Sequence, residues 1–127
     1  MTVDGTFTIR PGVDGRMEPI SLETLRERHR ERGDSYLEFL RESSMSAGLY
    51  RIPTGEPDLQ APHAEDEIYV VTAGRANIEI DGDTYPVEEG DVVFVEREVD
   101  HRFTDVEEDL ETLVLYAPPE GSLDVEE

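Results

Sequence analysis

Histidine and carboxylate side chains are the groups in this 127-residue chain whose types suit metal chemistry, since the sequence contains no cysteine. Thiolate metal sites, disulfides and cysteine nucleophiles are therefore excluded. Of the three histidines, His29 lies in a charged stretch and is interpreted as a solvated helix residue without a function. His63 and His101 each lie beside a predicted turn. Imidazole nitrogen with carboxylate oxygen, in the absence of sulfur, suits Fe, Mn, Ni, Zn or Cu.

Short strand-like runs separated by turn residues make up the chain from residue 44 onward. Ala76, Ile78 and Ile80 alternate with polar residues, which is the period-two pattern of a half-buried strand. Asp81-Gly82 then predicts a hairpin turn. The predicted strands cover residues 44–52, 67–72, 76–80, 84–87, 91–95, 101–104 and 110–116. Strands at this spacing are typical of an all-β sandwich or barrel.

The residues before 44 predict an N-terminal extension with one short strand and one short helix. The strand is predicted over residues 6–9, and the helix begins after an N-cap at Ser21 and ends at Gly33. The segment over residues 36–40 fits either a strand or a helical turn. We therefore divide the chain into an extension over 1–43, a barrel over 44–117 and an acidic tail over 118–127 that is expected to fray.

Two spaced motifs resemble those of the cupin superfamily. The first cupin motif, G(x)5HxH(x)3–4E(x)6G, is matched from Gly55 through His63 and Glu67 to Gly74. Ala61 stands where the first histidine of that motif belongs. The match covers the glycine spacing without a gap.

The second cupin motif, G(x)5PxG(x)2H(x)3N, is matched from Gly90 through His101. Glu96, Glu98 and Asp105 stand in its proline, glycine and asparagine places. The resemblance is to single-domain, type-2-like cupins. It implies an all-β fold, the double-stranded β-helix, which is a small antiparallel β-barrel or jelly roll with a site inside one mouth.

The resemblance also implies that His63, Glu67 and His101 hold a divalent transition metal, which could be Fe, Mn, Ni, Zn or Cu. Ala61 removes one of the four protein ligands that family members usually offer. The alternative is an empty or vestigial site, in which His63 is a solvated loop residue and His101 pairs with the neighbouring Asp100.

Strand alternation extends this site to neighbouring side chains. If Glu67 points into a barrel, so does Tyr69, and an inward His101 brings Phe103 with it. We therefore expect Tyr69 and Phe103 to be pocket or substrate contacts. Gln60, just before the position of the missing histidine, is a further candidate contact.

Three charged residues near the motifs have two interpretations each. Arg51 shares its parity with Ala47 and Leu49, so if these face the barrel interior, Arg51 stands at the rim and could hold a carboxylate-bearing ligand. The alternative is an arginine that reaches from a strand end to solvent. Glu65 and Asp66 are expected to be solvated loop carboxylates, and the alternative is that one of them replaces the missing histidine.

The charge balance is strongly acidic. Aspartate and glutamate number 32 against 11 basic residues, all of them arginine, and the net charge is −21. This charge works against binding to nucleic acid and anionic membranes. Dense carboxylates without lysine indicate the salt-rich cytoplasm of a halophilic archaeon, and the alternative is an acidic mesophile surface.

No apolar run of about 18 residues and no signal-peptide pattern occur, so we expect a soluble cytoplasmic protein.

The sequence lacks a P-loop, a dinucleotide-binding glycine motif and a serine-nucleophile elbow. The leading hypothesis is a metal-dependent cupin that binds or transforms a small polar organic molecule, with oxygenase or isomerase chemistry if it is an enzyme. No catalytic residue is assigned. The alternatives are a non-catalytic small-ligand binder or sensor with a vestigial metal site, and an interaction module. A homodimer is expected, with Phe7 and Ile9 as the strand that docks on a neighbour.

Overall fold

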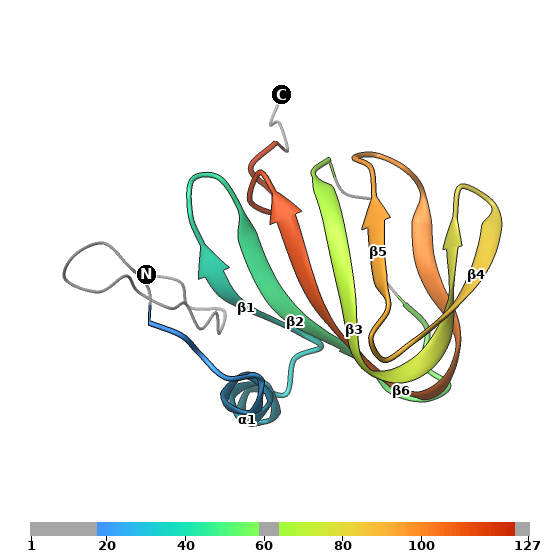
Figure 1. Ribbon diagram of the computed structural model, residues 1–127, viewed down its shortest axis with the longest axis horizontal. Helices are drawn as coiled ribbons and strands as arrows, with labels where there is room; N and C mark the ends of the chain where they lie inside the picture. Colours follow the sequence, from blue (N-terminus) through green and yellow to red (C-terminus); the bar gives the residue numbers. More distant parts are fainter. Residues whose placement is uncertain (1–17, 59–63, 124–127) are drawn as a thin grey trace.

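The computed structural model describes residues 18–58 and 64–123, which form one helix and six strands (Figure 1). The elements are α1 Leu22–Arg32, β1 Tyr36–Arg41, β2 Ser46–Ile52, β3 Asp66–Ile80, β4 Asp83–Glu88, β5 Val92–Val95 and β6 His101–Ala117. The predicted strand over residues 6–9 lies outside the described residues. No helix in the described part of the chain has the length and apolar character needed to cross a membrane.

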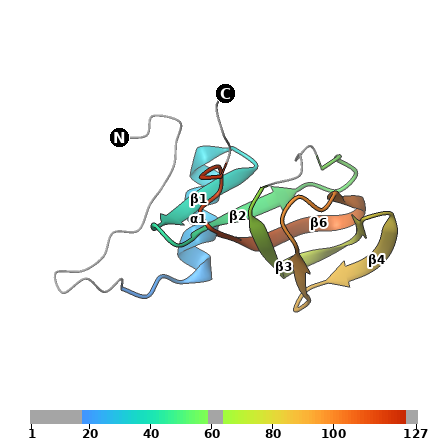
Figure 2. The ribbon, with the colours of Figure 1, turned by 90° about the horizontal axis from the view of Figure 1, so that it is seen from above.

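The predicted helix is confirmed. The Ser21 side chain accepts a hydrogen bond from the backbone N–H of Thr24, and the helix ends at Gly33 in the left-handed conformation that glycine adopts most easily. Leu25 and His29 are its buried residues. Figures 1 and 2 place α1 beside β1 and β2, on the side of the molecule away from β4.

The strands form an antiparallel sheet in the order β1-β2-β6-β3-β4, with β5 also paired to β3. The two long strands curve, so that the sheet bends into the open barrel in Figure 1. Asp81 and Gly82 join β3 to β4, and both have the positive φ that a two-residue hairpin turn requires. The all-β cupin-like fold expected from the sequence is confirmed.

Two pairs of predicted strands are each one continuous strand. The runs 67–72 and 76–80 belong to β3, and the runs 101–104 and 110–116 belong to β6. The register between β3 and β6 shifts several times between Val71 and Asn77. Gly74 lies within these irregularities at φ +90°. The residues that suggested a break therefore make β-bulges, which bend a strand without ending its pairing.

The segment over 36–40, undecided from sequence, is a strand. β1 pairs with β2, with Tyr36 opposite Tyr50. The sheet therefore begins before residue 44. Leu37 and Phe39 are buried, whereas Tyr36, Glu38 and Leu40 are only partly buried, which is the alternation of a strand with two unlike faces.

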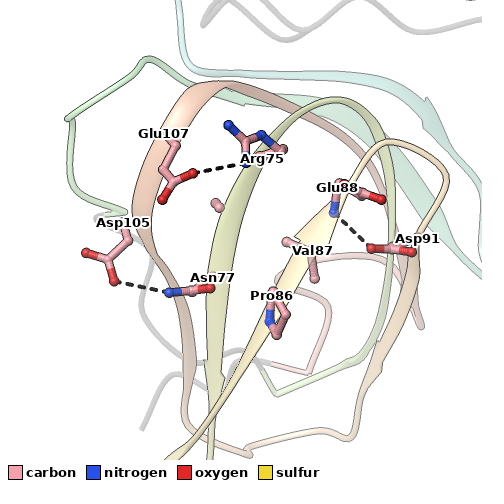
Figure 3. Close-up of a pocket in the computed structure, with 9 residues that line it drawn as sticks. Arg75, Asn77, Pro86, Val87, Glu88, Asp91, Asp105 and Glu107 are labelled. Atoms are coloured by element: carbon pink, nitrogen blue, oxygen red, sulfur yellow. Dashed lines mark hydrogen bonds and ion pairs between the residues drawn. The ribbon is translucent and has the colours of Figure 1, made fainter.

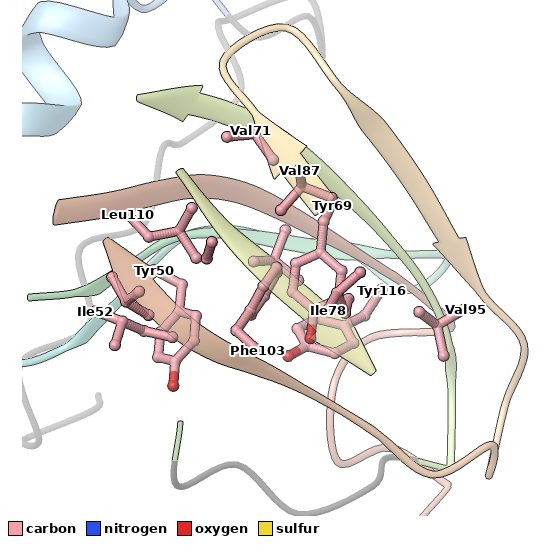
Figure 4. Packing of buried hydrophobic residues seen from close by; sticks show 13 residues of the cluster. Tyr50, Ile52, Tyr69, Val71, Ile78, Val87, Val95, Phe103, Leu110 and Tyr116 are labelled. Carbon is pink, nitrogen blue, oxygen red and sulfur yellow. The ribbon is translucent and has the colours of Figure 1, made fainter. Parts of the chain in front are cut away.

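The buried residues form two clusters on opposite faces of this curved sheet. The larger one fills the barrel interior, where Tyr69, Phe103 and Tyr116 lie close together (Figure 4). The smaller one lies between α1 and the outer face of the sheet and includes Leu25 and Leu49. The helix therefore covers the outside of the barrel at its β1–β2 side.

Hydrogen bonds hold the segment after β6, residues 118–123, against the rest of the molecule. The backbone N–H of Glu120 donates to the Ser46 hydroxyl at 2.9 Å, and Arg41 donates to the Glu120 carbonyl at 2.7 Å. The carboxylate of Glu65 accepts from the N–H of Gly121. The expectation that the tail frays from residue 118 is wrong for residues 118–123, because these bonds satisfy its backbone.

Candidate functional site

Glu67 and His101 meet inside the barrel. Glu67 lies near the start of β3 and His101 at the start of β6, and barrel closure brings their side chains together. The distance from His101 Nε2 to Glu67 Oε1 is 3.0 Å, and the two side chains are only 2% and 1% exposed. A carboxylate and an imidazole at this depth are costly to bury unless they satisfy one another or a third group.

The backbone fixes the orientation of the His101 ring. Its Nδ1 lies 2.9 Å from the carbonyl oxygen of Val99. A carbonyl only accepts hydrogen bonds, so Nδ1 carries a proton and donates it. In the neutral ring, Nε2 is therefore the nitrogen with a free lone pair, and it faces Glu67. The hydroxyl of Tyr69 lies 3.1 Å from the same Nε2.

The Glu67 carboxylate is under-satisfied. Within residues 18–58 and 64–123, neither of its buried oxygens accepts a hydrogen bond with good geometry. Burial alone lowers the pKa of His101, but the interaction with Glu67 and the bond to Val99 outweigh it, so the pKa is raised. A proton, or another cation, is thus favoured between the imidazole and the carboxylate.

Tyrosine rings surround this pair. Burial, followed by the charge of Glu67 among other groups, raises the pKa of Tyr69 and of Tyr116 above the ordinary value for tyrosine, so both phenols stay protonated. The Tyr69 ring packs edge to face on Phe103, with centroids 4.9 Å apart. Tyr69 and Phe103 therefore lie beside the site, as strand alternation predicted, and form an apolar wall with hydroxyl groups on it.

Asp58 is a buried polar residue near the site that the sequence did not reveal. Its carboxylate accepts from the Tyr50 hydroxyl at 2.7 Å and from the backbone N–H of Phe103 at 2.9 Å. It also lies close enough to raise the pKa of His101, after the larger contributions from Glu67. No periodicity marks this loop position, so no pattern could have predicted its burial.

The predicted metal ligands are described in part. Glu67 and His101 come together, whereas His63, Gln60 and Ala61 lie outside the described residues. In the part of the chain that the structure describes, no group of three or more His, Cys, Asp or Glu side chains is arranged to hold a metal ion.

Arg51 lies away from this site. Its face of β2 carries Ala47 and Leu49, which pack against α1 and not into the barrel. Ala47, Leu49 and Arg51 do lie on one face of β2, as strand alternation predicted. The expectation that this face points into the barrel was wrong, because it is the outer face, which is apolar where α1 covers it. Arg51 lines a hollow of about 280 Å³ together with His29.

His29 is buried, and its Nε2 lies 3.0 Å from the carbonyl oxygen of Ser35. Its interpretation as a solvated helix residue is therefore wrong.

Glu65 and Asp66 behave differently from one another. Glu65 is 1% exposed and holds the backbone of Gly121, so its prediction as a solvated carboxylate is wrong. Asp66 is partly exposed and pairs with Arg97 at 3.4 Å. Hydrogen bonds from the Arg97 side chain and backbone lower the pKa of Asp66.

A polar hollow borders His101. It has a volume of about 390 Å³, and the residues that line it are Asp58, Glu79, Asp81, Gly82, Asp100, His101 and Arg102. Arg102, its one arginine, lies 3.4 Å from Glu79. The wall is therefore predominantly negative, which suits neutral or cationic molecules better than anions.

A larger hollow of about 520 Å³ lies elsewhere, over β3 and β4 (Figure 3). Arg75 pairs there with Glu107 at 3.2 Å, and the Asn77 amide donates to Asp105 at 3.1 Å. These polar side chains pair with one another, and no histidine lines the hollow. We therefore assign the candidate site to the barrel interior.

Comparison with known proteins gives the family. The cupin domain family matches residues 48–116. An uncharacterised protein of Streptomyces coelicolor is 43% identical over 105 residues, which are 83% of this chain and all of that protein. This bacterial relative does not support an origin in a halophilic archaeon.

Solved structures agree in fold. KdgF from a Halomonas species superposes with a TM-score of 0.59 at 18% identity, over 65% of this chain and 76% of that one. The DMSP lyase DddQ from Ruegeria pomeroyi gives 0.60 at 22% identity, over 76% of this chain and 52% of that one. Since the family match spans more than half of the sequence and covers the barrel that holds Glu67 and His101, the chain belongs to the cupin family.

Proposed function

We propose that this cupin binds a divalent transition metal through Glu67 and His101, with His63 as the third protein ligand, and uses the site to bind or transform a small polar organic molecule. The observation that carries the proposal is the buried Glu67 carboxylate, whose oxygens form no well-aligned hydrogen bond among the described residues although Oε1 lies 3.0 Å from His101 Nε2. The metal would be Fe, Mn, Ni, Zn or Cu, since these accept nitrogen and oxygen ligands without sulfur.

The pair supplies one nitrogen and one oxygen donor, which such an ion accepts. Oε1 of Glu67 and Nε2 of His101 lie 3.0 Å apart, so these two atoms would hold the ion together. The bond from Nδ1 to Val99 holds the ring in the tautomer that leaves Nε2 available, as second-sphere bonds do in many metal sites.

When bound, the ion would supply Lewis-acid or redox chemistry, of the kind that oxygenases and isomerases use. The surrounding residues have roles of their own. Tyr69 keeps its proton and can donate a hydrogen bond to a polar group of the bound molecule, and Phe103 keeps water from that side. The negative hollow beside His101 favours a neutral or cationic molecule. With Arg51 on the outer face, a carboxylate-bearing ligand is less favoured.

The test is metal analysis of protein purified without chelator or nickel resin, followed by titration with Fe(II), Mn(II), Ni(II) and Zn(II) in molar KCl. We expect about one ion per chain, and at least a 100-fold loss of affinity in Glu67→Gln and in His101→Ala, because ligand loss exceeds the about 10- to 100-fold effect of second-sphere changes. Ala61→His should tighten binding.

Glu65→Gln is the matched control, since Glu65 is a carboxylate as deeply buried as Glu67 but bound to the C-terminal backbone. Its metal affinity should equal that of the wild type. If Glu65→Gln and Glu67→Gln weaken binding equally, the loss reflects folding and the assignment of Glu67 fails.

The second candidate is a non-catalytic small-ligand binder with a vestigial metal site. It is favoured by the Tyr69 hydroxyl, which at 3.1 Å already approaches the His101 nitrogen that a metal would need. A shared proton between His101 and Glu67 would then satisfy the pair without an ion. Metal binding by Ala61→His but not by the wild type would show that the natural metal site is vestigial and would favour this second candidate over the metal-dependent one.

We further propose that the protein works in a salt-rich cytoplasm. The 32 acidic residues and the absence of lysine support this setting. It does not depend on the metal proposal and is tested by the salt dependence of stability.

A further inference from the structure

Tyr36 brings a hydroxyl group into the barrel that the sequence analysis did not identify. It belongs to β1, ahead of the residues that the cupin family matches, and it packs against the cluster that fills the barrel interior. Its ring meets those of Tyr50 and Tyr116 edge to face, with centroids 6.4 Å apart in both cases. The hydroxyl oxygen is buried and has no hydrogen-bond partner among the described residues. Because such a group is costly, native proteins contain few of them.

Gly48 makes room for this ring. Gly48 lies on β2 opposite Glu38, two residues along β1 from Tyr36. A Cβ at position 48 would overlap the ring and the hydroxyl group of Tyr36. Gly48 is part of a regular strand, so the space for the ring, and not backbone freedom, is what requires glycine here. The two residues together hold the hydroxyl group in a buried position where no described residue bonds to it.

Glu67 is a second unsatisfied group in the same interior. Both of its carboxylate oxygens are buried and accept no well-aligned hydrogen bond among the described residues. Burial raises the pKa of Tyr36, so its phenol stays protonated. The carboxylates of Glu120, Glu38 and Glu67 lie near enough to raise this pKa further. The interior therefore contains a phenol whose hydrogen needs an acceptor and a carboxylate that can only accept.

We propose that the site takes a small neutral molecule with several hydroxyl groups, one of which accepts a hydrogen bond from Tyr36 while another donates to Glu67. The inference rests on the proposed function, since it takes the barrel interior around Glu67 as the binding site. Hydroxyl groups both accept and donate, so they satisfy the phenol and the carboxylate alike. A carboxylate on the ligand is repelled by the negative charges near Tyr36. An ammonium group leaves the phenol hydrogen without an acceptor.

A bound metal ion is compatible with this role of Glu67. The ion proposed above would bind Oε1, which lies 3.0 Å from His101 Nε2. The other oxygen, Oε2, is also buried and accepts no well-aligned hydrogen bond among the described residues, so it remains an acceptor for the ligand. The hollow that borders His101 is lined mainly by carboxylates, which disfavours an anionic ligand as well. The charges and the unsatisfied groups therefore select the same class of molecule.

The first test compares three four-carbon probes of different charge: erythritol, which is neutral and hydroxylated, the dianion succinate, and the diamine putrescine. NMR spectra are recorded in molar KCl on protein isotopically labelled at tyrosine Cζ, both metal-free and loaded with Zn(II). The chain has five tyrosines, and the Tyr36 resonance is the one that is missing in Tyr36→Phe. Erythritol should shift this resonance, and succinate and putrescine should leave it unchanged.

The second test measures the affinity for erythritol from the remaining tyrosine resonances. Tyr36→Phe should weaken binding about 3- to 10-fold, which is the effect of one hydrogen bond between neutral groups. Gly48→Ala keeps the phenol but displaces its ring, so it should weaken binding at least as much. Tyr85→Phe is the matched control: Tyr85 is 49% exposed on β4, so this variant should bind erythritol like the wild type.

Equal affinity of Tyr36→Phe and the wild type for erythritol would overturn the inference, because water would then satisfy the hydroxyl group. A Tyr36 resonance that responds to succinate or putrescine but not to erythritol would overturn it too. Metal titration of the wild type separates these results from the proposed function. A wild type that binds metal but no erythritol up to molar concentration contradicts only this inference, and one that binds erythritol but no metal contradicts only the metal site.

Discussion

At the scale of single residues, the pair that matters most outside the barrel is Arg26 with Glu111. The Arg26 guanidinium donates to both Glu111 oxygens, at 2.9 and 3.0 Å, and the Thr72 hydroxyl donates to one of them. Glu111 is only 4% exposed. This pair links α1 to β6, so it helps to hold the helix on the outer apolar face of the sheet.

Removal of Arg26 should destabilise the protein more than removal of an exposed arginine. Arg26→Met leaves a buried carboxylate without its cation, which costs about 3–5 kcal/mol for a fully buried pair, and about 2–3 kcal/mol here because Arg26 is 32% exposed. Arg97→Met, which breaks the more exposed pair with Asp66, should cost less than about 1 kcal/mol. Urea unfolding in molar KCl measures both, and equal costs would contradict this ranking.

The same pair has a defined pH dependence. Burial raises the pKa of Glu111, but the hydrogen bonds from Arg26 and Thr72 outweigh it, so the pKa is lowered. The contribution of the Glu111 carboxylate to the free energy of unfolding is fully present above the unfolded-state pKa of about 4.3. It is lost as the pH falls through the lower pKa of the folded state. The difference in unfolding free energy between the wild type and Glu111→Gln should therefore shrink below about pH 4. If the difference in unfolding free energy stays constant between about pH 7 and pH 3, this pH dependence is not due to Glu111.

Residues on strands were predictable, and buried polar residues in loops were not. Period-two alternation from Glu67 and His101 correctly placed Tyr69 and Phe103 inside the barrel. Asp58 and Glu65 carry no such signal, because only their tertiary partners decide that a charged loop residue is buried.

At the scale of elements, two glycines of the cupin motifs, Gly74 and Gly90, are needed for different structural reasons. A Cβ at Gly74 would overlap the backbone carbonyl of Asp109 on the neighbouring β6, whereas a Cβ at Gly90 would meet nothing. Both residues have a positive φ, +90° and +97°. Gly74 thus allows the close approach of two long strands at their bulge, and Gly90 serves only the turn.

Substitution by alanine separates these two effects. Gly90→Ala should cost about 1–2 kcal/mol, the penalty of a left-handed conformation for a residue with a Cβ. Gly74→Ala carries the same penalty and adds the overlap with rigid backbone, so we expect at least about 3 kcal/mol. Denaturant unfolding at one salt concentration compares them, and similar values would show that the β3–β6 contact yields easily.

The ends of the strands were predictable from the sequence in some places and not in others. The hairpin at Asp81-Gly82 was predictable, since both residues there adopt positive φ. The continuity of β3 through Gly74 was not, because a glycine between two apolar runs suggests a turn as readily as a bulge. The outer cover by α1, which reverses the face assigned to Arg51, depends on packing that alternation alone does not reveal.

At the scale of the whole molecule, surface charge sets the conditions for stability. The chain carries a net charge of −21, and few of its exposed carboxylates have a cation beside them because only 11 basic residues exist. Repulsion among these groups acts on the folded state more than on the expanded chain. The screening length falls from about 10 Å at 0.1 M salt to about 3 Å at 1 M, which removes most of this repulsion.

The melting temperature should therefore rise by about 10 °C between 0.1 M and 2 M KCl, which corresponds to a few kcal/mol for a domain of this size. A variant with Glu27→Gln, Glu56→Gln and Glu96→Gln tests the cause, because these three residues are exposed and their neutralisation changes the net charge from −21 to −18. Relative to the wild type, this variant should be more stable at 0.1 M and nearly equal at 2 M. If the two proteins respond to salt identically, or if melting is independent of salt, carboxylate repulsion does not govern stability and the high-salt setting loses its physical basis.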